Sequence, residues 1–277
     1  MIKKKSLRIL SLGAGVQSTT LALMIEKGQI AMVDCAIFAD TGGEPKAVYD
    51  HLDWLEKQLS YPVHRVQWRN LKEDVINGAK GEFKNFSIPF YSRKKGDTGK
   101  GRILRRQCTR DYKISPVIKK IRELLGYAKH KRVAPEVRVE QLIGISYDEL
   151  QRQRKNHHHY LENIYPLVDQ KIRRNDCLDW IKQNDYPEPP RSACTFCPYH
   201  SNKEWLVIKK NKKEWEEVVE MDRMIRGQRL SDDGKEYSQD ELFLHRDCKP
   251  IDEIDLEKKD DKNQYSLLDE CEGMCGN

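Results

Sequence analysis

The sequence predicts an α/β protein, in which a parallel sheet has helices on both faces and a mainly helical and irregular extension follows at the C-terminal end. Three observations indicate this class. Apolar runs of strand length alternate with amphipathic stretches of helical length over the first half of the chain. Glycine and proline stand at the boundaries between them. The first expected strand also leads directly into a turn of small residues that opens a helix.

The bulk composition limits the domain count and the class of partner. The chain has 277 residues, of which 38% are apolar and 34% charged, and its net charge is +6. This length is enough for one large domain or one domain plus an appendage, and we expect an α/β domain at residues 1–200 and a helical extension with a cysteine-containing tail at residues 201–277. The positive charge favours anionic partners. No run of about 18 apolar residues occurs, so we expect no membrane span and a cytoplasmic protein. In that reducing compartment, eight cysteines indicate metal or redox chemistry more than disulfides.

The first five elements alternate regularly between strand and helix. Residues 6–12 (SLRILSL) are apolar enough for a buried strand, residues 33–39 (VDCAIFA) form a second, and residues 63–68 form a third. Between the first two strands, a helical stretch over residues 18–27 ends at a glycine. Residues 45–59 begin with a proline, which suits a first helical turn, and have apolar residues at helical spacing. This order predicts parallel strands with crossover helices.

The later elements are less regular. Residues 78–107 are rich in glycine and basic residues, and we expect a mobile basic loop there, because long loops in compact domains often have functional roles. Residues 115–125 form the next expected helix, with Pro116 in its first turn. Residues 137–145 form the next expected strand. Further helices are expected at residues 148–155, 174–184 and 202–226.

A phosphate-binding turn is predicted where the first strand ends. Small residues at Gly13, Ala14 and Gly15 let backbone N–H groups approach phosphate oxygens, and the following helix adds the positive end of its dipole. The hydroxyls of Ser18 and Thr19 can donate to the same oxygens or cap the helix. The pattern matches neither the Walker P-loop nor the dinucleotide-binding fingerprint. An ordinary strand–helix turn would explain these residue types as well.

The segment from Ser11 to Thr19 resembles the PP-loop of the adenine nucleotide α-hydrolase superfamily, whose usual pattern is SGGxDS. Gly13 stands where the pattern has its first serine, and Gln17 stands in place of the aspartate. The resemblance implies a Rossmann-like fold of the HUP type with a bound adenine nucleotide. The nucleotide contacts that it implies are Ser11, Gly13, Ala14, Gly15, Gln17, Ser18 and Thr19.

The end of the second strand supports the same resemblance. Residues 38–45 (FADTGGEP) are similar to the DTG…P segment of phosphoadenylyl-sulfate (PAPS) reductases and their relatives. In a parallel sheet this segment lies beside the first turn, at the carboxyl ends of the strands, where ligands bind. The resemblance therefore implies that Asp40 and Thr41 border the nucleotide. A cap and turn for the next helix would explain them equally well.

The cysteines suggest a metal site. Cys194 and Cys197 form a CxxC pair, which can be half of a zinc or iron–sulfur site, or a redox dithiol. Cys108 lies in RQCTRDYKISP, which resembles a segment of the sulfonucleotide reductases that hold a [4Fe–4S] cluster, with Gln107 in place of one cysteine. The resemblance implies three cluster ligands, and Cys248 is the leading candidate for the fourth, with a tail cysteine as its rival. Zinc is the alternative metal.

The resemblance also implies catalytic groups. Related reductases carry a catalytic cysteine on a C-terminal ECG segment, and residues 270–273 (ECEG) are similar, which makes Cys271 a candidate nucleophile. Neighbouring carboxylates raise the pKa of a thiol, so a basic group such as Lys113 has to offset them. Arg152 or Arg154 is expected to bind a phosphate or sulfonate. Cluster ligation or a disordered end is the alternative for the tail, and a solvated helix face is the alternative for the arginines.

Three functions are compatible with these features. The first is a PP-loop ATP pyrophosphatase that adenylates an oxygen of DNA or tRNA, with Mg²⁺ at the phosphates, as in the ATP-pyrophosphatase components of DNA phosphorothioation systems. Sulfur would then come from a cysteine desulfurase or another donor. The second is reduction of PAPS or adenylyl sulfate, in which Cys271 attacks the sulfur and sulfite is released. The third is an inactive nucleotide-sensing or cluster-binding scaffold, which Gln17 permits. Each is compatible with a homo-oligomer.

Overall fold

The computed structural model describes residues 6–79, 88–99, 101–226 and 240–258. Its centre is a five-stranded sheet with the strand order β3-β2-β1-β6-β7. The strands are β1 (Ser6–Leu12), β2 (Cys35–Asp40), β3 (Val63–Gln67), β6 (Arg138–Ile143) and β7 (Leu161–Ile164). Each of the four pairings between them is parallel. The predicted α/β class with a Rossmann-like parallel sheet is therefore confirmed.

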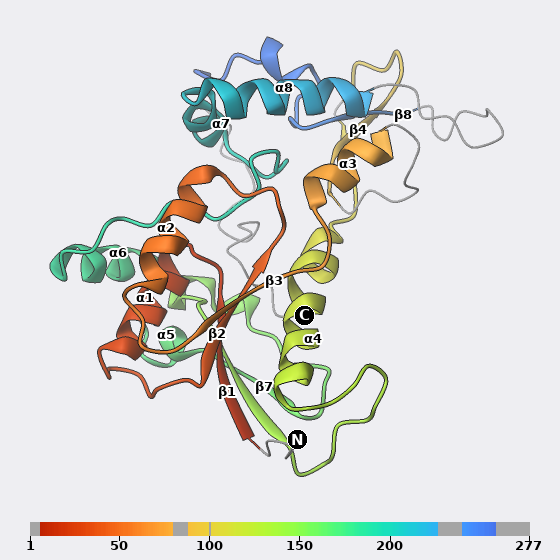
Figure 1. Ribbon diagram of the computed structural model, residues 1–277. Helices are drawn as coiled ribbons and strands as arrows, with labels where there is room; N and C mark the ends of the chain where they lie inside the picture. The colour runs from red at the N-terminus through yellow and green to blue at the C-terminus, as the bar shows by residue number, and fades with distance from the viewer. Residues whose placement is uncertain (1–5, 80–87, 100, 227–239, 259–277) are drawn as a thin grey trace.

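Helices cover both faces of this sheet (Figure 1). Those on one face are α1 (Val16–Glu26), α2 (Lys46–Glu56) and α6 (Arg174–Gln183), and the helix on the other face is α4 (Ser115–Leu124). Successive side chains of a strand point to opposite faces, so Leu10 and Leu12 join the first core while Leu7 and Ile9 join the second. Strands buried on both faces have nearly continuous apolar sequences, which explains why they could be predicted.

A smaller part of the molecule has a third hydrophobic core. Its elements are α3 (Leu71–Ala79), α7 (Asn202–Lys209), α8 (Lys212–Arg226), η3 (Ile251–Glu253) and an antiparallel sheet of β5 (Arg102–Ile103), β4 (Tyr91–Lys94) and β8 (Asp240–Phe243). Phe90 and Trp205 are fully buried in it. The buried carboxylate of Asp222, on α8, accepts hydrogen bonds from the backbone N–H groups of Leu244 at 2.9 Å and Ile251 at 3.0 Å. These bonds hold the chain after β8 against α8.

The structure differs from the prediction of a basic loop at residues 78–107. β4 and β5 lie within this segment, and β4 pairs with β8 from the far end of the chain. Ile88, Phe90 and Tyr91 are buried there. The glycines and lysines around them hide this short apolar run, and its partner strand is too distant in sequence to be recognised.

Two expected helices also differ. The helix expected at residues 148–155 is the shorter 3₁₀ helix η2 (Tyr147–Arg152), in which Glu149 departs from helical geometry with φ −112° and ψ 20°. The helix expected at residues 202–226 is divided into α7 and α8. Neither these nor any other helix of the described residues combines the length and hydropathy that a membrane span requires.

Candidate functional site

The strand order creates a topological switch point at the carboxyl ends of β1 and β6. β1 pairs with β2 on one side and with β6 on the other. The connections that leave β1 and β6 therefore diverge, and the crevice between them is where open α/β sheets bind ligands. Three loops meet at this edge of the sheet. They are residues 13–15 after β1, residues 41–45 after β2 and residues 144–146 after β6.

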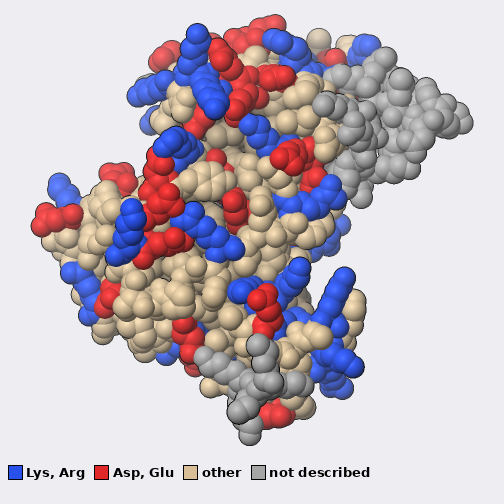
Figure 2. Space-filling view, in the orientation of Figure 1, with Lys and Arg blue, Asp and Glu red and all other residues tan. Residues whose placement is uncertain are grey.

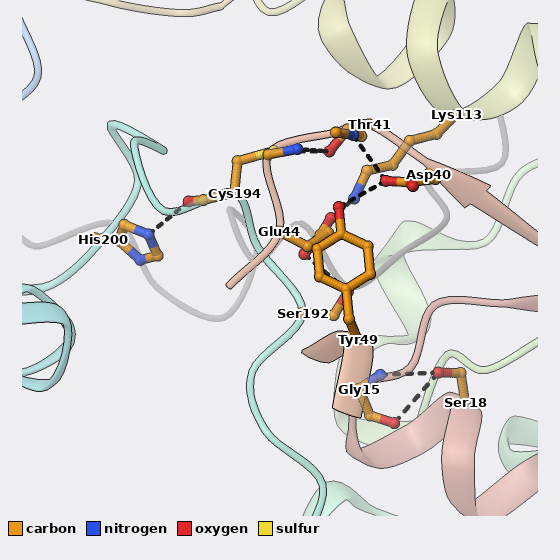
Figure 3. A network of polar contacts seen from close by, with 12 residues as sticks. Gly15, Ser18, Asp40, Thr41, Glu44, Tyr49, Lys113, Ser192, Cys194 and His200 are labelled. Carbon is orange, nitrogen blue, oxygen red and sulfur yellow. Dashed lines mark hydrogen bonds and ion pairs between the residues drawn. The ribbon is translucent and has the colours of Figure 1, made fainter. Parts of the chain in front are cut away.

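The turn after β1 contains a left-handed residue and leads directly into α1. Ala14 adopts the left-handed region with φ 56°, a conformation that costs a non-glycine residue about 1–2 kcal/mol. Gly15 is extended and precedes α1. Its N–H donates to Ser18 Oγ at 3.2 Å, and the Ser18 hydroxyl donates back to the Gly15 carbonyl oxygen (Figure 3). The first turn of a helix has N–H groups without helical partners and carries the positive end of the dipole, which is the chemistry that an anion site requires.

Gly144 sets the distance between this turn and the loop after β6. A Cβ atom on Gly144 would lie 2.8 Å from both the Cα and the N atom of Ser18 and 3.1 Å from the carbonyl carbon of Gln17. These are backbone atoms, which cannot rotate away as a flexible side chain can. Only glycine therefore allows the two segments to approach this closely. Gly144 was not among the predicted site residues, although a glycine directly after a strand signals such an approach.

The side chain of Gln17 belongs to a buried polar network between α1, η2 and α6. Its amide nitrogen donates to Glu149 Oε2 at 3.2 Å and Ser146 Oγ at 3.4 Å, and its amide oxygen accepts from Arg174 Nη1 at 2.7 Å. Arg152 forms an ion pair with the same Glu149. A side-chain amide can donate to a carboxylate and accept from a guanidinium at the same time, whereas an aspartate at this position would add a second carboxylate beside Glu149. Gln17 and Arg152, both expected to contact the nucleotide or substrate, are thus bonded within the protein.

Two other predicted contacts are bonded inside the core. Ser11 Oγ accepts a hydrogen bond from Gln141 Nε2 at 2.8 Å. Thr19 Oγ1 lies 3.1 Å from His51 Nε2, and burial lowers the pKa of His51 to about 4, which keeps this ring neutral near pH 7. The Ser18 hydroxyl is bonded to Gly15 as well, so the backbone N–H groups at the start of α1 are the remaining candidate donors.

The loop after β2 orients Asp40 and Thr41 differently (Figure 3). Asp40 Oδ1 accepts from the Gly42 N–H at 2.7 Å and from the Tyr49 hydroxyl at 2.8 Å. Burial and this carboxylate raise the pKa of Tyr49, so the phenol remains a donor at neutral pH. Thr41 Oγ1 lies 3.2 Å from Cys194 Sγ. The loop after β2 thus joins the edge of the sheet to the CxxC segment.

A buried ion pair lies in the same group of contacts. Lys113 Nζ is 3.4 Å from Glu44 Oε1, and the two side chains are only 6% and 1% exposed. Glu44 Oε2 also accepts from the Ser192 hydroxyl at 3.4 Å. Lys113 comes from the π-helix η1 (Thr109–Ile114), a rare element that occurs often at functional sites. Removing either member of a buried pair leaves an uncompensated charge, so the two side chains fix each other.

Cys194 lies beside this ion pair, and its neighbours act on the pKa of its thiol in opposite directions. Burial raises the pKa of its thiol, and the Glu44 carboxylate raises it further, while the Lys113 ammonium and the Thr41 hydrogen bond lower it. The net result is a pKa well above the ordinary value, so the sulfur is a protonated thiol at neutral pH. Neutralising the charge of Glu44 would lower the pKa of the Cys194 thiol and so favour the reactive thiolate.

Close backbone packing holds the CxxC loop in place. The Thr195 N–H donates to the Gly43 carbonyl oxygen at 2.8 Å. A Cβ atom on Gly43 would lie 2.7 Å from the Phe196 ring and 3.4 Å from Cys194 Sγ. His200 Nε2 is 2.9 Å from the Cys194 carbonyl oxygen, and burial lowers the pKa of His200 to about 3. A neutral imidazole therefore supports the loop.

The predicted four-cysteine metal site is not formed by the described residues. No three or more of their His, Cys, Asp and Glu side chains are grouped so that they could hold a metal ion. Cys108 and Cys194 border the third hydrophobic core. Cys248 packs instead with Tyr91 and Phe243 beside the antiparallel sheet, because β4 and β8 pair there. The sulfurs as placed do not fit a cluster, and we derive no step through one. The predicted nucleophile Cys271 lies outside the described residues.

Comparisons with known proteins find similarity among solved structures. No family model matches the chain, and no curated protein matches it. Among solved structures, it is similar to the crystal structure of a phosphoadenylyl-sulfate (PAPS) reductase from Candida auris in a phosphate complex. The identity is 14% and the TM-score 0.38, over 67% of this chain and 75% of that chain. A likeness at this level supports no conclusion about activity, so function has to follow from the site itself.

Proposed function

We propose that this chain is an adenine-nucleotide-binding enzyme that cleaves ATP at the α-phosphate, releases pyrophosphate and couples this to sulfur transfer onto a nucleic acid. One observation carries the proposal. The turn at residues 13–15 lies at the switch point of the sheet and leads into α1. The buried side chains of Cys194, Lys113 and Glu44 lie beside the loop after the neighbouring strand β2. The resemblance of residues 11–19 to a PP-loop agrees with this placement.

Phosphate recognition would come from the backbone. The turn contains no lysine, and the Ser18 hydroxyl is bonded to Gly15, so backbone N–H groups at the start of α1 would be the donors. Bonds from such donors to a charged phosphate oxygen contribute about 1.5–3 kcal/mol each. Mg²⁺ would arrive with ATP and offset the phosphate charge.

The reaction would proceed in two displacements. An acceptor oxygen attacks the α-phosphorus, the bond between the α-phosphorus and the bridging oxygen breaks, and pyrophosphate leaves. Sulfide then attacks the activated centre, and AMP leaves with the acceptor oxygen. Where a cysteine desulfurase or another donor supplies the sulfur as a persulfide, its outer sulfur would make the attack, and an external thiol would then cleave the S–S bond, forming a disulfide with the donor cysteine and leaving the sulfur on the product. Lys113 and Cys194 lie beside the loop after β2. The ammonium there would stabilise negative charge on phosphate or sulfur.

Product analysis tests this function. The protein is incubated with ATP, Mg²⁺, a sulfide source and either DNA or tRNA, and the nucleotides and phosphates are separated. We expect AMP and pyrophosphate in equal amounts. ADP with orthophosphate would contradict cleavage at the α-phosphate. Release of sulfite from PAPS without any requirement for ATP would instead support a sulfonucleotide reductase.

A further inference from the structure

Trp68 is exposed at the same edge of the sheet as the candidate site. It directly follows β3, whose last residue Gln67 pairs with Asp40 at the end of β2. The backbone after it is bonded to the site, because the Leu71 N–H donates to the Thr41 carbonyl oxygen at 2.7 Å. The side chain of Trp68 nevertheless remains 51% exposed. A large aromatic ring is thus presented to solvent one loop away from Cys194.

The neighbours of Trp68 hold its ring in a fixed position. Tyr112 packs against it at 66° with a centroid distance of 5.1 Å, and the Arg69 guanidinium lies 5.8 Å from its ring centre. The buried carboxylate of Asp74 joins both neighbours, because it accepts from the Tyr112 hydroxyl and forms an ion pair with Arg69. A ring and a guanidinium that are already ordered lose little freedom when a ligand stacks on them.

The segment that leads to Tyr112 is strongly basic. Between residues 88 and 113, the described residues include eight Lys or Arg and two Asp. Arg106 in this segment lies over the ring of Tyr199, with the guanidinium 5.4 Å from the ring centre, two residues beyond Cys197. Figure 2 shows basic and acidic groups mixed over the face that it draws. Two residues of this segment thus lie near the candidate site, Arg106 beside the CxxC loop and Tyr112 beside Trp68.

We propose that Trp68 and Arg69 form a stacking site for an unpaired base of a single-stranded nucleic acid, and that the basic segment binds the adjoining phosphates. Aromatic rings and guanidinium planes both stack on bases, and stacking tolerates any base identity. Tyr112 and Lys113 are consecutive residues of η1, with Tyr112 against Trp68 and Lys113 against Glu44. A base on Trp68 would therefore place the adjoining backbone beside the candidate site. This inference rests on the proposed function, and it identifies the sulfur acceptor as a single-stranded nucleic acid.

Binding measurements without ATP test the stacking site. Fluorescence anisotropy is recorded with short labelled single-stranded DNA, single-stranded RNA and duplex DNA. We expect Trp68→Ala to weaken single-strand binding by about tenfold to a hundredfold, since stacking on one side chain contributes about 1–3 kcal/mol. Trp68→Phe, which keeps a ring, should retain most of the affinity. The matched control is Trp215→Ala, because Trp215 also has a cation over its ring, Lys209 at 5.5 Å, but lies on α8. Thermal unfolding establishes that each variant is folded.

The outcomes separate this inference from the proposed function. Equal binding by wild type and Trp68→Ala, or binding of duplex alone, or no binding at all, would overturn the stacking site. Loss of affinity in Trp68→Ala and Trp68→Phe alike would overturn it too. Trp68-dependent binding together with no pyrophosphate release from ATP would support the stacking site and contradict the proposed chemistry. Comparison of the affinities for single-stranded DNA and single-stranded RNA shows which nucleic acid is the partner.

Discussion

Replacing Gly144 with alanine is the sharpest perturbation of the turn at residues 13–15. The new methyl group would lie 2.8 Å from two backbone atoms of Ser18, whereas ordinary contacts to a Cβ atom are about 3.5–4.0 Å. Relieving that overlap requires the first turn of α1 to move by roughly 1 Å. Neither the ligand chemistry nor any charge changes, so the variant tests the position of the turn alone.

The expected cost follows from this displacement. Overpacking a tight contact costs about 1–3 kcal/mol of stability. The loss of binding should be larger in relative terms, because several N–H donors move away from the phosphate together. A misplacement of about 1 Å can reduce activity by about a hundredfold. We therefore expect Gly144→Ala to remain folded and to bind ATP about tenfold to a hundredfold more weakly.

Calorimetric titration with ATP measures this effect, and urea unfolding measures the stability. Gly99→Ala is the control, because its Cβ atom would meet only the Asp97 side chain, at 3.2 Å, on the exposed turn between β4 and β5. We expect the control to bind ATP as the wild type does. A folded Gly144→Ala protein with wild-type affinity would refute the placement of phosphate at the start of α1.

Three further predictions concern the buried polar groups. Glu44→Gln should lower the pKa of the Cys194 thiol and Lys113→Met should raise it, because these charges act on the sulfur in opposite directions. The rate of Cys194 alkylation as a function of pH, followed by mass spectrometry, measures both pKa shifts. Shifts of the same sign would refute the arrangement. Gln17→Glu places a second carboxylate beside Glu149 and should cost about 1–3 kcal/mol in urea unfolding, whereas no loss would contradict the network. His200, with its pKa lowered to about 3, binds its proton more weakly in the folded state than in the unfolded state, so stability falls as the pH drops below 6.5; about 2 kcal/mol should be lost through it between pH 7 and pH 5. His200→Gln should show a shallower pH dependence, and an unchanged slope would exclude this role.

The features that the sequence predicted are local ones. Residues 6–12 and 33–39 are short apolar runs that can be buried on both faces of a sheet, so β1 and β2 were recognisable. The turn at Gly13 to Gly15 follows directly from its small residues at the end of a strand. Such signals depend on residues within a few positions of one another.

The features that the sequence did not predict depend on distant partners. Gln17 appears in the sequence as part of a phosphate loop, and only Glu149 and Arg174 turn it into a member of a buried network. The pairing of β4 with β8 joins segments that no local pattern connects. The same pairing places Cys248 in another cluster, away from the cysteines with which it was grouped.

A crystal structure with α,β-methylene ATP, in which the bond to be cleaved is replaced, tests the location of the nucleotide most directly. We expect phosphate oxygens at about 2.9 Å from backbone nitrogens at the start of α1, with the α-phosphate facing the loop that contains Thr41 and Glu44. A nucleotide bound elsewhere on the chain, or an empty turn at saturating concentration, would contradict the proposed enzyme.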